Sequence, residues 1–294
     1  MSRIQERYDE MIGAMNVAEL DIPIAGVKFY KQGESIPSAV SDCVPDGITL
    51  TSCQSARQAG FGDSVLLTAE SIGCVAAAIT FGLVDQHQDK PMGDSLVYTD
   101  VMKGQSGLGE KFVPPTPNDF TSGTVYACAA AGRPEFALFG KDDTGRFQTQ
   151  EVAKKALSDM MAIQPADTQG VFIFAKDFDD VDVEPDVVVL AVRPVELTRI
   201  IQAYQFQSGK RVTASMGGLR VVNSDLMVRP YLTGEMNIST YCLGARLIGQ
   251  FEADRLGIGM PFNQFEEMVD GMTLSQGGFP FQAYPGAADA VHAG

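Results

Sequence analysis

The sequence predicts a protein of the α/β or α+β class, in which a mixed sheet is flanked by helices. Short apolar runs typical of strands alternate with segments whose apolar residues recur every three or four positions, as in amphipathic helices. The run 186–192, Asp-Val-Val-Val-Leu-Ala-Val, is apolar on both faces and is therefore expected to be a central strand.

The other elements follow from the same two periodicities. Expected helices span 3–19, 52–59, 72–81, 151–161 and 194–208. Expected strands span 24–30, 47–51, 64–68, 171–175, 211–214 and 226–229, and strand–helix alternation continues through 235–250. Region 84–124 is rich in Gly, Pro, Asp and Thr and has no sustained period, which is typical of a functional or mobile segment.

The chain of 294 residues is long enough for one globular domain, or for two closely packed halves over 1–148 and 149–276. Residues 277–294 are rich in Gly, Pro and Ala and are expected to form a frayed tail.

Composition excludes several classes of partner. The net charge of −15 and the lack of a basic cluster argue against nucleic acid. No apolar run approaches the roughly 18 residues of a membrane helix, so no membrane partner is expected. The N-terminus lacks the pattern of a signal peptide, which predicts a cytoplasmic location. A small-molecule ligand is the expected partner, and a homo-oligomer is expected only from its general frequency.

Cysteines provide the strongest functional signal in the sequence. The chain has five: Cys43, Cys53, Cys74, Cys128 and Cys242. An odd number without an export signal argues against a disulfide framework. Cys53, Cys74 and Cys242 each follow a predicted strand and open a predicted helix, where backbone N–H groups and the helix dipole stabilise a thiolate. Such junctions gather at one edge of an α/β sheet, so these three thiols are expected to converge.

Three converging thiolates favour an iron–sulfur cluster, of the 4Fe-4S or 3Fe-4S type, because soft sulfur ligands select it. Zinc competes, but the tight Cys-x-x-Cys pairs of closed zinc sites are absent from the sequence. Cysteines that are merely packed in the core, or that act as redox-active thiols, remain alternative interpretations.

Cations near these cysteines favour an anionic ligand. Arg57 and Arg246 each follow a candidate cysteine by one helical turn, and Lys28 interrupts an apolar strand. They are predicted to bind substrate, and ordinary surface salt bridges are the alternative. His87 and His292 are the only histidines and provide little for a catalytic triad. The loop 104–111 lacks the spacing of a phosphate-binding loop.

These segments together resemble a bacterial and archaeal family, the domain of unknown function 169. The likeness spans nearly the whole chain and rests on 22–29, 53–59, Cys74 with Ala77, Phe81 and Gly82, 185–190, 193–194, 202–204, 242–246 and 257–261. The resemblance implies a family common in anaerobes and places Cys53, Cys74 and Cys242 at the family's cysteine positions. Many members have a further cysteine where this chain has residues 215–218, Ser-Met-Gly-Gly, so the resemblance implies either an iron without a protein ligand or no cluster.

The leading hypothesis is a cytoplasmic iron–sulfur protein of anaerobic-type metabolism, acting through redox or Lewis-acid chemistry on a small anionic molecule. The alternative is a non-catalytic binding or accessory protein in which the cysteines are structural and region 84–124 covers a ligand or partner.

Overall fold

The structure is a computed structural model that describes residues 1–15, 22–92, 115–127 and 145–275. Its described strands are β1 (Ile24–Lys31), β2 (Val65–Leu67), β3 (Thr168–Phe174), β4 (Val187–Val192), β5 (Asn237–Ser239) and β6 (Leu256–Pro261). They form one sheet in the order β2-β3-β1-β4-β6-β5, and every pair of neighbours is antiparallel. The α/β or α+β class is confirmed, and the antiparallel pairing makes α+β the closer description.

Helices and helical turns in the described residues are α1 (Arg3–Met15), α2 (Ser38–Ser41), α3 (Ser52–Ala59), α4 (Val75–Thr80), α6 (Pro117–Thr121), α7 (Gln150–Ser158), α8 (Pro194–Ser208), the π-helix η4 (Ser224–Val228), α9 (Arg229–Thr233), α10 (Leu243–Leu247) and α11 (Phe262–Leu274).

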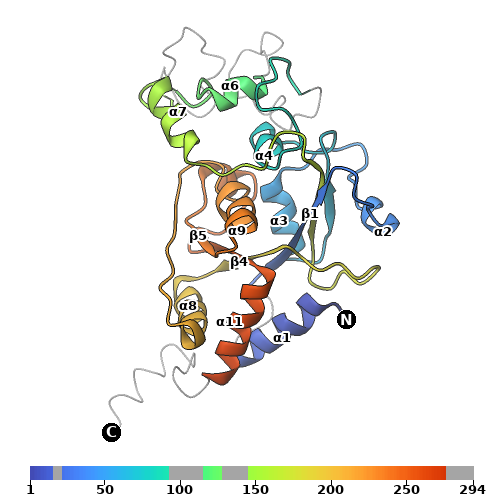
Figure 1. Cartoon of the computed structure of the whole chain (residues 1–294), viewed down its shortest axis with the longest axis vertical. Coiled ribbons are helices and arrows are strands. Elements are labelled where there is room, and N and C mark those ends of the chain that lie inside the picture. Colours follow the sequence, from blue (N-terminus) through green and yellow to red (C-terminus); the bar gives the residue numbers. More distant parts are fainter. Residues whose placement is uncertain (16–21, 93–114, 128–144, 276–294) are drawn as a thin grey trace.

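The sheet separates two hydrophobic layers because its strands alternate side chains between faces. We call one side the helix face; it presents Phe172, Val188 and Ile258 to α1, α8 and α11. The other side, the cysteine face, presents Val27, Val171 and Val189, which pack in one core with residues of α3, α4, α7 and η4. Figure 1 shows α1, α8 and α11 gathered at one end of the molecule and α4, α6 and α7 at the other.

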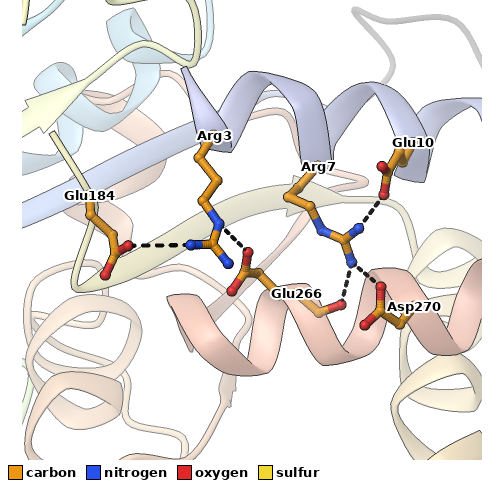
Figure 2. A network of polar contacts seen from close by, with 6 residues as sticks. All are labelled: Arg3, Arg7, Glu10, Glu184, Glu266 and Asp270. Atoms are coloured by element: carbon orange, nitrogen blue, oxygen red, sulfur yellow. Dashed lines mark hydrogen bonds and ion pairs between the residues drawn. The ribbon is translucent and has the colours of Figure 1, made fainter. Parts of the chain in front are cut away.

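Ion pairs tie α1 to α11 on the helix face (Figure 2). Arg3 Nε donates to Glu266 Oε1 at 2.6 Å, and Arg7 Nη2 donates to the Glu266 carbonyl oxygen at 2.7 Å. Arg7 also pairs with Glu10 and Asp270. Both arginines therefore bind α1 to α11, two helices that lie near opposite ends of the chain.

Most predicted elements are confirmed, including the central strand 186–192 and the helices at 52–59 and 194–208. The strand predicted at 47–51 is reduced to one parallel bridge between Leu50 and Ile72. Because Ile72 is part of this bridge, the helix predicted from residue 72 begins at Val75. The strands predicted at 211–214 and 226–229 were wrong, because 211–214 is irregular and Leu226 lies in η4. A short, fully buried apolar run has the same pattern in a strand and in a helical turn, which explains the second error.

Two glycines in β6 explain why the helical turn η4 can pack directly against this strand. A Cβ added to Gly259 would lie 1.9 Å from the Leu226 carbonyl oxygen, and one on Gly257 would lie 2.3 Å from Leu226 Cδ1. Without side chains at these positions, η4 packs directly on the backbone of β6. That contact carries Asn223 and the preceding loop onto the cysteine face.

Candidate functional site

Cys53, Cys74 and Cys242 line one cavity on the cysteine face, which we call the cysteine cavity. Its volume is about 50 Å³. One water molecule needs roughly 10–15 Å³ on this measure, so the cavity has room for a compact group of atoms. Cys242 is 8% exposed, and Cys53 and Cys74 are partly exposed.

Cys53 is placed by a well-capped helix. Thr51 Oγ1 accepts a hydrogen bond from the Gln54 N–H at 3.2 Å, and Gln54 Oε1 accepts one from the Thr51 N–H at 3.0 Å. This reciprocal capping box fixes the first turn of α3, in which Cys53 is the second residue.

Cys74 is brought beside Cys53 by the bridge between their leading segments. The Leu50 N–H donates to the Ser71 carbonyl oxygen at 3.1 Å, and the Gly73 N–H donates to the Leu50 carbonyl oxygen at 2.8 Å. Because the two segments run parallel at this point, the helices that follow them start side by side. Cys74 is the N-cap residue of α4.

Cys242 reaches the cavity from the opposite edge strand of the sheet, as the N-cap of α10. Tyr241 directly before it has a φ of +64°, a left-handed conformation that is costly for a residue with a side chain. Its ring stacks on Phe251 at a centroid distance of 4.2 Å. A Cβ on Gly249 would lie 2.9 Å from Cys53 Cβ, so this glycine allows the loop after α10 to pack against Cys53.

The expected position of all three cysteines at helix starts is therefore confirmed, although the reason given for their convergence was wrong. The sheet is antiparallel, and its strand ends do not gather at one carboxyl edge. Cys74 follows β2 and Cys242 follows β5, which are the two edge strands. They meet because the segments after both strands turn onto the same face.

The electrostatic surroundings of Cys53 disfavour an isolated thiolate. Burial raises the pKa of the Cys53 thiol well above its ordinary value, and negative charge on Cys242 or Cys74 would raise it further. A thiol with a raised pKa is a weak nucleophile. A bound metal cation reverses this situation, because it deprotonates thiols and offsets their charge.

Arg57, Arg246 and Lys28 lie outside the lining of the cysteine cavity. Arg57 pairs with Glu252 and lies over the Phe61 ring at 4.1 Å. Arg246 Nη2 donates to the carbonyl oxygens of Thr240 at 2.8 Å and Arg255 at 2.9 Å. Both guanidinium groups therefore hold the loop that follows α10.

Lys28 belongs to the other side of the sheet. It is in register with Phe172 of the helix face, and its Nζ lies 2.8 Å from Asp186 Oδ1. Substrate binding by Arg57, Arg246 and Lys28 stays a prediction, and the contacts seen for them are intramolecular.

Comparison with known protein families identifies one family whose model covers the segments that carry the three cysteines. The model of the domain of unknown function 169 family, described as uncharacterised ArCR, matches residues 15–271. The chain belongs to this family. No curated protein and no solved structure matches it. The match contains all three cysteines of the cavity.

Two arginines that the sequence analysis did not select line the cysteine cavity: Arg146 and Arg220. Arg220 Nε donates to the Tyr126 hydroxyl at 3.1 Å, and Arg220 Nη2 donates to the Phe120 carbonyl oxygen at 2.9 Å. Phe120 and Tyr126 also line the cavity, so the described end of the irregular region 84–124, with the residues just after it, contributes to the site.

Asn223 is a further lining residue that the sequence analysis missed. It is 3% exposed, and its side-chain amide has no hydrogen-bond partner within the described part of the chain. The polar run Asn223-Ser224-Asp225 between apolar neighbours was the sequence signal that could have drawn attention to it.

Segment 215–218, where many family members are expected to have a cysteine, is held by buried polar groups. The Ser215 N–H donates to Asn237 Oδ1 at 2.8 Å, and the Gly217 N–H donates to Asp225 Oδ2 at 3.1 Å. Leu219 follows directly and lines the cavity. Burial raises the pKa of Asp225 to about 6.

Across residues 1–15, 22–92, 115–127 and 145–275, no group of three or more His, Cys, Asp or Glu side chains is arranged around a single metal ion. Such an arrangement is what zinc requires. Each cysteine of an iron–sulfur cluster can bond a different iron, so its ligands do not need to meet at one point. The donor set of the cavity, three thiols beside guanidinium groups, fits a compact anionic cluster.

The remaining sequence candidates lie away from the cavity or outside the described residues. Cys43 packs on the helix face, and its Sγ donates to the Ala39 carbonyl oxygen at 3.3 Å. His87 is exposed at a turn. Cys128, His292, the loop 104–111 and the tail 277–294 lie outside the described residues. Among the helices that are described, none has the length and hydropathy needed to cross a bilayer.

Proposed function

We propose that this protein binds an iron–sulfur cluster through Cys53, Cys74 and Cys242 and uses it on a small anionic molecule. The observation that carries the proposal is the meeting of three thiols, from three separate segments of the chain, in one cavity. The proposal includes the cytoplasmic location expected from the sequence, where thiols stay reduced.

The surroundings of the three cysteines favour a cluster over the two other chemistries considered. A single zinc ion would need ligands that converge on one point, and the described residues offer no such group. A redox-sensing thiol needs a lowered pKa, whereas the pKa of Cys53 is raised. A cluster accommodates spread thiolates and offsets their charge.

When bound, such a cluster supplies an electron or, at an iron without a cysteine ligand, a Lewis-acid position. The residues of this chain would surround it. Cys53 is held by the capping box of α3, and Gly249 allows the loop after α10 to pack against Cys53. If the further cysteine of other family members ligates the cluster, Ser215 and its neighbours would leave one iron without a cysteine ligand.

The test is strictly anaerobic purification, followed by a visible absorption spectrum and analysis of iron and acid-labile sulfide. We expect broad charge-transfer absorption and bound iron in the unmodified protein. Cys53→Ala, Cys74→Ala and Cys242→Ala should each lose most of the absorption. Cys43→Ala is the matched control, because its thiol packs on the other face of the sheet and should leave the spectrum unchanged.

A second function is favoured by the packing of the same cysteines. Cys242 is part of the hydrophobic core of the cysteine face, and Cys53 and Cys74 pack against it. A non-catalytic binding protein with structural cysteines therefore predicts a colourless protein without iron. It also predicts that the three alanine variants lose stability and change no spectrum, and that result would refute the cluster.

A further inference from the structure

We infer that Arg220 and Asn223, with Arg146 beside them, form a binding site for a small carboxylate in the wall of the cysteine cavity. This inference deepens the proposed function, on which it rests for the role of the anion: it assigns the substrate class and replaces Arg57, Arg246 and Lys28 as the leading candidates for anion binding. Binding of the anion itself can be measured separately from the cluster.

Charge is the first reason. The chain as a whole carries a net charge of −15, yet no Asp or Glu among the described residues lines the cysteine cavity. Two guanidinium groups line it instead. An acidic protein would repel an anion over most of its surface, so this local reversal of sign makes the cavity the favoured place for one.

Arg220 is held in a defined orientation with one donor left over. Its Nε and Nη2 donate to Tyr126 and Phe120, whereas Nη1 makes no hydrogen bond to a described residue. The residue has a φ of +55°, so the backbone is held in a costly conformation at the position that presents this guanidinium. Fixing two of the three nitrogens reduces the entropy lost when the third binds an anion.

Asn223 supplies the second, independent observation. Its side chain is nearly fully buried, lines the same cavity as Arg220 and lacks a hydrogen-bond partner among the described residues. Buried amides normally have partners, since an unpaired one costs about 1–3 kcal/mol. A ligand with oxygen acceptors would satisfy this amide.

The class of ligand follows from the donors and the space. One guanidinium nitrogen and one amide N–H, from two different residues, match the two oxygens of a planar carboxylate. Arg146 adds positive charge on the same cavity. The described cavity of about 50 Å³, roughly the space of three to five water molecules, matches the size of a small carboxylate such as acetate.

The experiment is isothermal titration of the anaerobically purified full chain with sodium acetate at constant ionic strength, alongside sodium chloride and inorganic phosphate. We expect acetate to bind and chloride not to. Arg220→Gln should weaken acetate binding at least about tenfold, as expected for loss of a charged hydrogen bond. Asn223→Asp, which keeps the shape but adds negative charge, should weaken it at least as much.

Arg211→Gln is the matched control, because it removes an exposed guanidinium that does not line the cavity, and it should bind acetate like the unmodified protein. Asn223→Ala provides a second reading if Arg220→Gln fails to fold, since the Asn223 amide makes no bond that folding needs. It should weaken acetate binding several-fold, with circular dichroism unchanged.

Three results would overturn the inference: no acetate binding to the folded protein, phosphate binding more tightly than acetate, or equal affinity in the Arg220 and Asn223 variants. Absorption and iron analysis of the same samples separate the two claims. A colourless protein that binds acetate through Arg220 refutes the cluster and supports the anion site. A coloured protein that binds no acetate supports the cluster and refutes the anion site.

Discussion

The two faces of the sheet are built in different ways. On the helix face, α1, α8 and α11 have 13, 15 and 13 residues and run across the sheet as continuous apolar stripes. On the cysteine face, α3, α4 and α10 have 8, 6 and 5 residues. Short helices place many helix ends and loops above one sheet, so side chains from distant segments can meet there. The helix face consequently buries apolar area, whereas the cysteine face also assembles a site.

Polar groups follow the same division. On the helix face, buried Arg199 donates to Ser275 Oγ at 3.0 Å and to the Met272 carbonyl oxygen at 2.9 Å, although its Nε has no partner among the described residues. On the cysteine face, the buried Tyr241 hydroxyl lacks a partner within the described part of the chain. Left-handed residues reduce stability, and one of them, Arg220, lines the cysteine cavity. Such strain is typical of functional sites.

The largest loss of stability is expected at Gly259, where the packing of the cysteine face requires a residue without a side chain. In Gly259→Ala the new Cβ would meet the Leu226 backbone, which cannot rotate away as a side chain could. Overpacking against backbone should lower the free energy of unfolding by about 3 kcal/mol or more. Chemical denaturation monitored by circular dichroism measures this loss.

Gly13→Ala is the corresponding change in α1 on the helix face. Gly13 is exposed, and a Cβ there would meet nothing within 4 Å. This variant should gain roughly 0.5–1 kcal/mol from helix propensity. If Gly259→Ala and Gly13→Ala changed the free energy of unfolding equally, close backbone packing would not distinguish the cysteine face from the helix face.

A smaller, pH-dependent effect is expected at Asp225, a residue of η4 that is 7% exposed. Its pKa is raised from 3.8 to about 6, mainly by burial. The unfolded chain therefore ionises first as the pH rises, and stability is lost between about pH 4 and 6. Above pH 6 the lost stability amounts to roughly 3 kcal/mol at most.

Asp225→Asn removes this titration and keeps an oxygen that can accept from the Gly217 N–H. We expect it to be more stable than the unmodified protein above pH 6, by up to about 3 kcal/mol, and nearly equal to it at pH 4. Exposed Asp254→Asn is the control and should change little at either pH. Denaturation midpoints of Asp225→Asn and the unmodified protein at the two pH values measure this difference. If the variant gained more stability at pH 4 than above pH 6, the raised pKa of Asp225 would be refuted.

The smallest effects are expected in the ion pairs of the helix face (Figure 2). Arg7 is 15% exposed and contacts three partners, so Arg7→Ala should cost about 1 kcal/mol. Arg3 is 58% exposed, and Arg3→Ala should cost less than about 0.5 kcal/mol. Thermal unfolding at low and high salt measures both, because salt screens exposed pairs.

A loss of several kcal/mol in Arg3→Ala would mean that charge pairing, and not apolar burial, holds α1 in place. The comparison of the two faces would then need revision.

Local signals predicted the elements that lie on regular periodicities. Val187–Val192 was recognisable because both of its faces are apolar, and α8 because Pro194 and Gly209 mark its two ends. The expected strand at 226–229 failed because Leu226, Met227 and Val228 are buried on all sides in η4. The packing of Leu226 depends on Gly257 and Gly259, which are distant in sequence, so no local pattern contains the answer.

The candidate site was predictable in the same limited way. Cys53, Cys74 and Cys242 could be chosen from the sequence because each starts a helix, and helix starts leave local marks such as the Thr51–Gln54 capping box. The polar run at Asn223 marks a buried polar residue, but neither it nor Arg220 could be placed beside the cysteines from the sequence. Only the packing of η4 on β6 brings both residues to the cavity.

The sequence by itself determined most of the helices and the central strand, which residues can supply thiols, and the family to which the chain belongs. Those properties depend on side-chain type and short-range spacing. The tertiary structure decided the antiparallel order of the strands, the meeting of three cysteines over one face, and the choice of cations beside them. These depend on contacts between segments far apart in the chain, which become defined only when the two hydrophobic layers pack against the sheet.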